Sequence, residues 1–421
     1  MYVQGQNQID KFWIYADRQL RGPQFDVTKL YVFSQAILKG LKIVWIPLDE
    51  KKDKPQAIFE GLNDKGMQLS AIELLCSYLF TPLIDTVTKH HENIHNEKWL
   101  KSIKKVGNEG DFEFYLRNLF SINKPKMIGK GRKLYTNFKN NNKELSKQKA
   151  YDTINEIAEN IDLFNQIIKP QDPKYKHPMT EINTILIKIK QTDMSSSIPF
   201  ILAILKEQKG GKITDVDAIA ILNILMILLV RRKVCGVATN MYDVFFPSLL
   251  NKIINEPDKI KAFKDQILKE ELWVSDQEFK DSLINKSLYK QTESEFVRLI
   301  LQEVDKKMQS HGQFPDYSSI NTIEHVMPQT LNDEWKTYLG DEANDLSLER
   351  ITNSIGNLCL ISGKANSSIQ QDSFETKKIR YTEVSALTRD LKGRTGKWNM
   401  QAIKIRSEYL AEKALEIWSW N

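Results

Sequence analysis

Apolar residues recur at every third or fourth position through residues 151–312, with charged and amide side chains between them. This spacing places the apolar side chains on one face of a helix and predicts a succession of helices. No sequence unit returns at a fixed period, so we expect the helices to pack as a bundle rather than as a solenoid. The predicted helices are 154–168, 182–189, 199–208, 215–230, 242–254, 259–268 and 293–308.

The pattern differs in the residues that precede this region. Residues 41–48 (LKIVWIPL) are rich in β-branched and aromatic side chains, which predicts a strand. Ser70 and Glu73 have the spacing of a capping box, in which each side chain accepts a hydrogen bond from a backbone N–H at the start of a helix. Apolar residues continue that helix to position 80, and residues 112–120 predict another.

After the bundle the pattern changes again. A polar stretch with glycine and proline, 311–319, is followed by two short apolar segments, 320–326 and 357–362, and then by basic helices. The short segments have the length and composition of strands. The sequence therefore predicts a mainly α protein with α+β parts, in which a helical bundle precedes a small α+β module at the C-terminus.

Charge is distributed unevenly along the 421 residues, which hold 60 Lys and Arg against 54 Asp and Glu for a net charge of +6. Residues 121–150 contain nine basic residues and one acidic residue, and residues 364–406 contain ten and four. Two basic stretches favour an anionic polymer as a partner. For the first stretch, solvated lysine-rich loops are an equally good interpretation.

The cysteines and the apolar stretches limit the class of protein further. Cys76, Cys235 and Cys359 lie far apart, which argues against a disulfide framework or a cysteine-built zinc site and favours a reducing, cytoplasmic setting. The longest apolar stretch, 216–230, contains two polar residues and is shorter than the roughly 20 residues that a membrane span needs. The polar N-terminus is unlike a signal peptide, so we expect no membrane partner.

One segment has the spacing of a zinc protease motif. His91, Glu92 and His95 satisfy H-E-x-x-H, which on a helix would place both imidazoles on one face with the carboxylate as base. The surrounding residues are polar, however, and a zinc helix of this type needs an apolar side that buries the ligands beneath a cleft. We therefore interpret this segment as a solvated, histidine-rich helix end.

The C-terminal module carries the stronger candidate site. His325 would end a short strand after Glu324, Asn357 would begin the return strand, and Asn366 would lie on the helix that follows. Phosphodiester hydrolysis uses these parts, namely a base for water, ligands for a divalent cation and a group that orients the base. A lone histidine on a strand is usually structural, but the neighbouring carboxylate and the two amides favour a nuclease site.

These residues also carry a resemblance to a known family. The segments TIEHVMPQTLNDEW, GNLCLIS, ANSS and SFETKK resemble the C-terminal nuclease domain of GmrSD-type, modification-dependent (type IV) restriction endonucleases. That domain is a His-Me finger (HNH-like) nuclease, also described as a ββα-metal fold. The resemblance implies that His325 is the general base, that Asn357 is the amide that positions the finger, and that Asn366 supports the metal.

The remaining assignments in this module follow from placement. Glu324 stands beside His325 and is expected to be a metal ligand, and a few hard ligands of this kind suit Mg²⁺ or Mn²⁺. The basic residues after the finger helix are expected to contact DNA phosphates. They are Lys364, Lys377, Lys378 and Arg380.

The resemblance extends upstream. The segment IFEGLNDKGMQLSAIELLCSYLF resembles the later part of the N-terminal, ParB-like nucleotide-using domain of the same enzymes, which implies that Phe59, Asn63 and Gly66 belong to a nucleotide site. KLYTNFK and LVRRKVCG resemble the helical region that joins the two domains. The early D-G-Q-Q-R motif of that domain is missing, and residues 4–7 (QGQN) replace it poorly. We therefore expect NTP binding only when a partner polypeptide, or the missing N-terminal part, completes the site.

The expected organisation is a partial ParB-like nucleotide domain with a basic loop (1–150), a helical connecting bundle (151–312) and a His-Me finger nuclease domain (313–421). The expected function is metal-dependent cutting or nicking of modified foreign DNA by one half of a split or truncated phage-defence restriction enzyme. The alternative is a non-catalytic DNA-binding subunit that retains the finger fold.

Overall fold

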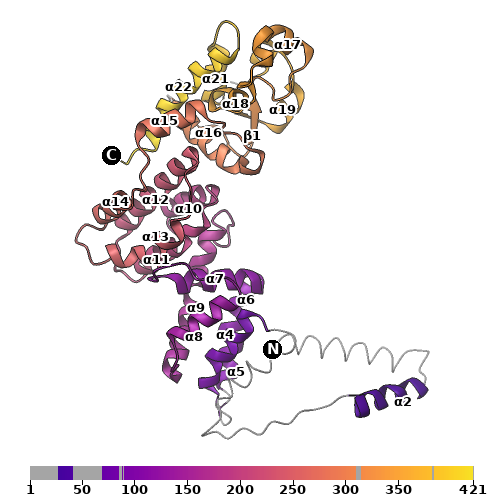
Figure 1. Ribbon diagram of the computed structural model, residues 1–421, viewed down its shortest axis with the longest axis vertical. Coiled ribbons are helices and arrows are strands. Elements are labelled where there is room, and N and C mark those ends of the chain that lie inside the picture. The colour runs from indigo at the N-terminus through magenta and orange to yellow at the C-terminus, as the bar shows by residue number, and fades with distance from the viewer. Residues whose placement is uncertain are drawn as a thin grey trace. The chain divides into compact units, whose positions relative to one another are not determined.

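The computed structural model describes residues 27–40, 69–84, 88, 90–309, 314–381 and 384–420. These residues form helices, joined by loops, and one small two-stranded sheet, which confirms the expected mainly α class (Figure 1). The chain divides into two compact units. Unit 1 comprises Met1–Arg117 and Ile128–Glu159, and unit 2 comprises Asn118–Met127 and Asn160–Asn421.

Unit 1 is helical throughout its described residues. Its helix α4 begins at the predicted capping box, where the N–H of Glu73 donates to Oγ of Ser70 (3.2 Å) and the N–H of Ser70 donates to Oε2 of Glu73 (2.8 Å). In the core, the rings of Trp99 and Phe112 meet edge to face at 5.1 Å. The helices are α2 (Val27–Gln35), α4 (Ala71–Phe80), α5 (His90–Ile94), α6 (Lys101–Val106) and α8 (Arg132–Asn141), and α7 (Glu109–Ser121) and α9 (Lys147–Ile168) continue into unit 2.

Two predictions for the N-terminal part fall on residues that the structure does not describe. They are the strand at 41–48 and the nucleotide site at Phe59, Asn63 and Gly66, all of which lie outside the described residues. The helix predicted at 112–120 lies within α7 and is confirmed.

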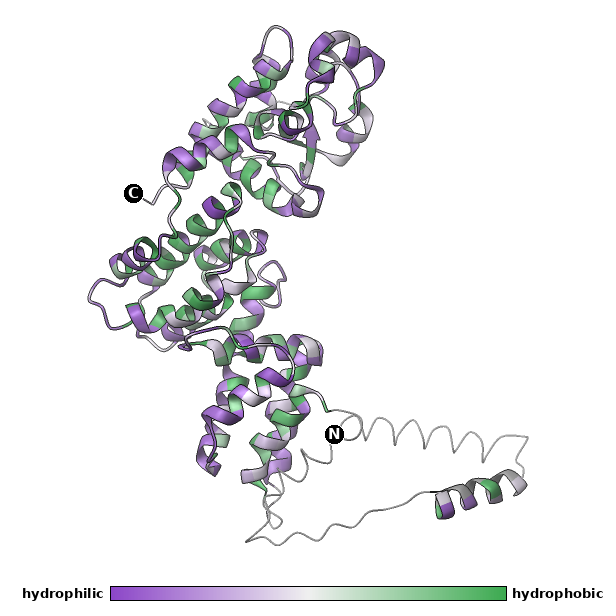
Figure 2. Ribbon diagram, viewed as in Figure 1, coloured by the Kyte–Doolittle hydropathy of each residue, from purple (hydrophilic) through white to green (hydrophobic). Residues whose placement is uncertain are grey.

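The first part of unit 2 is a helical bundle around α12 (Asp215–Cys235). Thr214 caps this helix by accepting a hydrogen bond from the N–H of Asp217 (3.1 Å), and Gly236 ends it with a φ of 66° that glycine adopts without strain. Most positions of α12 are buried, and Figure 2 shows hydrophobic residues along its length. None of the described helices is long and apolar enough to cross a membrane. The neighbouring helices are α10 (Thr180–Gln191), α11 (Ile198–Lys209), α13 (Tyr242–Ile253) and α14 (Lys259–Lys269).

The second part of unit 2 contains the sheet. Strand β1 (Thr322–His325) pairs antiparallel with β2 (Leu358–Ile361), so that His325 lies opposite Leu358 and Thr322 lies opposite Ile361. Helix α19 (Gly363–Ile369) begins directly after β2, where Ser362 caps it. Both predicted strands are confirmed, and the order strand, strand, helix is the one expected. The remaining helices are α15 (Asp276–Asn285), α16 (Ser294–Met308), α17 (Asp333–Leu339), α18 (Leu348–Thr352), α20 (Phe374–Arg380), α21 (Ala386–Gly393) and α22 (Met400–Ile417).

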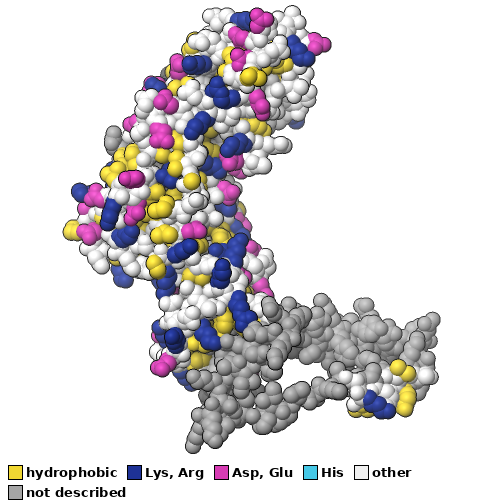
Figure 3. Space-filling model, in the orientation of Figure 1, with side chains coloured by type: hydrophobic (Ala, Val, Ile, Leu, Met, Phe, Trp, Pro, Cys, Tyr) yellow, Lys and Arg dark blue, Asp and Glu magenta, His cyan; other side chains and the backbone are white. Residues whose placement is uncertain are grey.

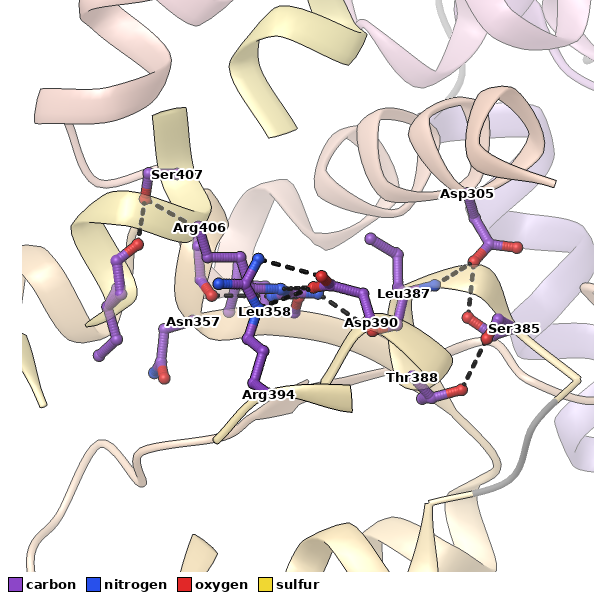
Figure 4. Close-up of polar contacts among 12 residues, drawn as sticks. Asp305, Asn357, Leu358, Ser385, Leu387, Thr388, Asp390, Arg394, Arg406 and Ser407 are labelled. Carbon is purple, nitrogen blue, oxygen red and sulfur yellow. Dashed lines mark hydrogen bonds and ion pairs between the residues drawn. The ribbon is translucent and has the colours of Figure 1, made fainter. Parts of the chain in front are cut away.

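A buried arginine fixes the start of β2. The guanidinium of Arg406, on α22, donates to the carbonyl oxygens of Gly356 (2.8 Å) and Leu358 (2.9 Å) and to a carboxylate oxygen of Asp390 (2.6 Å). Figure 4 shows Arg406 together with Leu358 and Asp390. Gly356 lies so close to α22 that an added Cβ would stand 2.1 Å from a helix carbonyl oxygen. The segment that carries Asn357 is therefore held closely against α22.

A buried carboxylate fixes α16 against the same module. Asp305 Oδ1 accepts hydrogen bonds from the Ser385 hydroxyl (2.6 Å) and from the N–H of Leu387 (2.8 Å) at the start of α21 (Figure 4). Its other oxygen accepts from the hydroxyl of Tyr317 (2.7 Å), before β1. A carboxylate at a helix N-terminus is stabilised by the exposed N–H groups and the helix dipole. Asp305 therefore joins α16 to the segment before β1 and to the start of α21.

Candidate functional site

His325 ends β1 and lies between the sheet and two loops. Its ring meets the ring of Tyr289 edge to face at 4.6 Å, and its Nε2 lies 3.1 Å from Oδ1 of Asn353, just after α18. The residue as a whole is partly exposed. A histidine in this setting is positioned by its neighbours.

The contacts of Asn353 determine which nitrogen of His325 carries the proton. The amide nitrogen of Asn353 donates to the carbonyl oxygen of Glu349 (2.9 Å), which fixes Oδ1 on the side of the histidine. That oxygen also accepts from Nε2 of Gln329 (2.8 Å). Because an amide oxygen only accepts, the neutral His325 must donate from Nε2, and its Nδ1 keeps the basic lone pair.

Burial also sets the charge of this histidine. It lowers the pKa of His325 to about 4, and the Lys377 ammonium contributes in the same direction, while the hydrogen bond to Asn353 acts against both. The imidazole is therefore neutral at neutral pH. A neutral imidazole with one fixed N–H and one free lone pair has the form that a general base needs.

Asn357 is buried, and both ends of its amide are hydrogen-bonded. Its Oδ1 accepts from the N–H of Met327 (2.8 Å) and from Nε1 of Trp398 (3.1 Å). Its amide nitrogen donates to the carbonyl oxygens of Met327 (2.8 Å) and Thr352 (2.8 Å). The side chain thus clamps the loop after β1 to the end of α18, so its placement is that of a residue that positions His325 rather than of one that contacts substrate.

Glu324 lies on the opposite side of β1 from His325, as neighbouring residues of a strand do. Its carboxylate is buried and forms an ion pair with the ammonium of Lys377 at 2.6 Å, and the hydroxyl of Tyr381 donates to the same oxygen at 3.5 Å. Burial raises the pKa of Glu324, and the ion pair acts against this shift. The carboxylate expected to hold a metal is thus already bound to a cation of the protein.

The other predicted residues occupy α19 and α20. Asn366 is partly exposed on α19 and lines an open groove, and Lys364 is exposed on the same helix. Lys378 donates to the carbonyl oxygen of Arg394 (2.8 Å), and Arg380 donates to that of Ser368 (2.7 Å) and lies 3.4 Å from Asp372.

Lys377 differs from these basic residues because its side chain has no exposed surface. Besides its pair with Glu324, its ammonium donates to the carbonyl oxygen of His325 at 2.9 Å. A buried ammonium with two protein partners cannot reach a phosphate at the surface. The interpretation of Lys377 as a DNA contact is therefore corrected to one of support for β1.

The predicted metal ligands do not fit a divalent cation as a pair. Mg²⁺ and Mn²⁺ favour charged oxygen ligands, and the one predicted carboxylate, that of Glu324, is taken up by Lys377. What remains on the exposed side is the imidazole of His325 and the amide of Asn366, which are neutral. No group of three or more His, Cys, Asp or Glu that could hold a metal is found among the residues that the structure describes.

The groove beside Asn366 has a volume of about 1030 Å³ and lies within unit 2. One wall is formed by the start of β1 with Asn366 and Tyr289, which is also the ring that contacts His325. The other wall is formed by α10 of the bundle and by α16. Tyr289 therefore both contacts the candidate base and lines the groove.

The H-E-x-x-H segment lies in unit 1, at the junction of α5 with a π-helical turn, His95–Leu100. Ile94 and Trp99 are buried, so the expectation that every face is polar was wrong. The His95 ring packs edge to face on Phe80 at 5.2 Å, and burial lowers the pKa of His95.

The sequence did not single out Asn353 or Tyr289, the two residues that contact the His325 ring. Both come from segments far from His325, and neither stands in a motif. For Lys377 a signal existed, because Phe374, Lys377 and Tyr381 have the spacing of one helix face. That spacing indicates that Lys377 shares the buried side of α20.

Comparison with known proteins identifies the segment that carries the site. Residues 273–413 match the family model described as GmrSD restriction endonucleases, C-terminal domain. No curated protein matches the chain. The matched segment contains β1, β2 and α19 together with every candidate residue from Glu324 to Arg380. This part of the chain is thus similar to the C-terminal domain of a family of restriction endonucleases, enzymes whose substrate is DNA.

Proposed function

We propose that the chain is a DNA endonuclease in which His325 is the general base for phosphodiester hydrolysis. The observation that carries the proposal is the hydrogen bond of 3.1 Å between His325 Nε2 and Asn353 Oδ1, which leaves Nδ1 as the basic nitrogen. The match of residues 273–413 to a restriction endonuclease domain supports DNA as the substrate. The arrangement of β1, β2 and α19 is compatible with a His-Me finger.

In the proposed reaction, His325 Nδ1 takes a proton from a water molecule, whose oxygen attacks the phosphorus. The bond between phosphorus and the leaving oxygen breaks, and that oxygen takes a proton from solvent. Asn353 keeps the imidazole in the reactive tautomer, and Asn357 holds the loop that follows His325. We assign no step to a metal ion, and the expected requirement for Mg²⁺ or Mn²⁺ is part of the test.

We further propose that cleavage serves a phage-defence system that acts on modified foreign DNA. The likeness of the sequence to GmrSD-type enzymes upstream of the matched segment supports this role. A partner polypeptide, or a further N-terminal part, would supply the early nucleotide motif and complete the site of Phe59, Asn63 and Gly66. NTP would then regulate the nuclease.

The direct test is cleavage of plasmid DNA, with and without modified cytosines, by the purified chain in Mg²⁺, in Mn²⁺ and in EDTA. His325→Ala is expected to lower the rate by about 10²–10⁴-fold, as is usual for loss of a general base. The matched control is His90→Ala, an exposed histidine of unit 1, which should cut like the wild type. Cleavage by His325→Ala at the wild-type rate would refute the proposed base.

A non-catalytic DNA-binding subunit is the second candidate, and one observation favours it. The only carboxylate among the predicted metal ligands is buried against Lys377. This candidate predicts that the chain binds DNA but cleaves neither substrate in any divalent metal, with or without a partner that supplies the early nucleotide motif.

A further inference from the structure

The groove beside Asn366 extends the candidate site onto the helical bundle. Three basic side chains reach it, Lys188 from α10 and Arg298 and Lys306 from α16. All three are partly buried along their stems, with 22%, 23% and 37% of the side chain exposed. Basic residues held in this way present their charged ends in fixed positions, at a lower entropic cost for binding than fully exposed lysines.

One carboxylate in the groove holds two of these three cations. Glu303, on α16, accepts from Lys188 at 2.6 Å with one oxygen and from Lys306 at 2.7 Å with the other. Although burial favours the protonated form, the two ammonium groups lower the pKa of Glu303. Arg298 has its own partner, Glu295, whose side chain is 63% exposed.

We propose that this groove binds the DNA strand that His325 cuts, with Lys188, Arg298 and Lys306 in contact with its phosphates and with Glu303 as an internal competitor. The inference rests on the proposed function. It adds α10 and α16 to the residues of α19 and α20 that were expected from the sequence to contact DNA phosphates.

Continuity with the candidate base supports DNA as the occupant. Tyr289 lines the groove and contacts the His325 ring, and Asn366 lines it from α19. A strand in the groove would therefore be separated from the proposed base by one side chain, that of Tyr289. The wall between the charges consists largely of hydroxyl and amide side chains, which suit the polar edges of nucleotides and would not favour an apolar partner helix.

The surface of unit 2 gives a second argument. On the face seen in Figure 3, Lys and Arg are interspersed with Asp and Glu and form no continuous basic patch. The groove also pairs its charges, but its three cations share two carboxylates, which leaves an excess of one positive charge, and one of the two carboxylates, Glu295, is mostly exposed. Asp305 joins α16 to the segments that carry Ser385 and Tyr317, and these contacts hold the two walls of the groove at a fixed distance.

The test compares neighbouring lysines of one helix. Lys306 lines the groove, whereas Lys307 pairs with Glu416 of α22 (3.1 Å) and does not line it. Binding of a labelled DNA duplex by the full chain is measured by fluorescence anisotropy in EDTA, over a range of salt concentrations. The slope of log K against log salt is negative, and Lys306→Ala should make it less steep by about 0.9, the value for one phosphate contact. Lys307→Ala should leave the slope unchanged.

Glu303→Gln provides the opposite change. It releases Lys188 and Lys306, so the variant should bind DNA more tightly than the wild type and with a steeper salt dependence. Equal slopes for Lys306→Ala and Lys307→Ala, or weaker binding by Glu303→Gln, would overturn the proposal that the groove binds DNA. So would a wild type that does not bind DNA at all.

Two further outcomes distinguish this proposal from a nucleotide-binding groove and from failure of the proposed function. A nucleoside triphosphate also carries phosphates, so displacement of DNA by micromolar GTP in the wild type but not in Lys306→Ala would make the groove a nucleotide site and overturn the proposal. Failure of the proposed function looks different, because DNA would then bind with the predicted slopes while His325-dependent cleavage is absent in every metal.

Discussion

The ammonium of Lys377 lies 2.6 Å from the carboxylate of Glu324, and neither side chain is more than 4% exposed. The same ammonium donates to the carbonyl oxygen of His325 at 2.9 Å. The pair therefore joins α20 to β1 and fixes the backbone of the candidate base. Glu324 was expected to bind a metal and Lys377 to contact DNA, but the two side chains form an ion pair with each other.

Removal of one partner of this pair should destabilise the protein strongly. Lys377→Met leaves a buried carboxylate without a countercharge, which typically costs about 3–5 kcal/mol. The control is the next residue, Lys378→Met, because Lys378 is partly exposed, pairs with the exposed Glu375 at 3.4 Å and donates to one carbonyl oxygen, so its loss should cost clearly less. Urea denaturation of the three proteins measures the difference, and equal losses would contradict the buried role.

The double variant Lys377→Met/Glu324→Leu tests whether Glu324 also serves a metal. Replacing a buried ion pair by apolar side chains of similar size is often neutral, so we expect most of the stability to return. If Glu324 only supports β1, the metal concentration that gives half-maximal cleavage should equal that of the wild type. A several-fold higher metal requirement in this stable variant would restore Glu324 as a ligand.

Asn353 should act on the rate through His325. Asn353→Leu removes the acceptor that fixes Nε2–H and should slow cleavage, whereas Asn353→Asp keeps an acceptor and adds a negative charge. A carboxylate beside an imidazole raises its pKa, by about one to three units for a close pair. The acid limb of the pH–rate profile should therefore move to higher pH in Asn353→Asp. Gln329→Ala, which removes the other partner of Asn353 Oδ1, is the control and should leave the limb in place.

The pKa of His325 also predicts how stability depends on pH. Because the folded-state pKa is about 4 and the ordinary value is 6.5, the unfolded chain binds more protons between these values. Stability should therefore fall as the pH decreases from about 6.5 to about 4. His95 and His177 contribute with the same sign, so the test is the difference between the wild type and His325→Phe. The wild type should lose more stability between pH 7 and pH 4.5, and an equal loss would show that the pKa is not lowered.

Short-range pattern was sufficient for much of the fold and for part of the site. Helical periodicity located α12, the capping box located the start of α4, and short β-rich runs located β1 and β2. His325 and Asn357 follow from the ends of those strands. The contacts that decide their chemistry join residues far apart, since Lys377 is 53 positions from Glu324. The spacing of Phe374, Lys377 and Tyr381 sets Lys377 apart from Lys378 in the sequence, but only packing shows that its partner is Glu324.

Asn357→Asp is the sharpest test of the clamp on the loop after β1. The substitution keeps the shape of the side chain but replaces an amide nitrogen that donates to the carbonyl oxygens of Met327 and Thr352, both at 2.8 Å. A carboxylate there would face two acceptors in a buried site, and a buried polar group without its partner costs about 1–3 kcal/mol, more when it is charged. We expect a loss of stability of at least that size and slower cleavage, because the loop that follows His325 loses its support. Asn366→Asp, on the partly exposed α19, is the matched control and should retain wild-type stability. Since the charged form of the introduced carboxyl group is the disfavoured one, the destabilisation should shrink as the pH is lowered toward the pKa of that group, and a pH-independent loss would contradict this account.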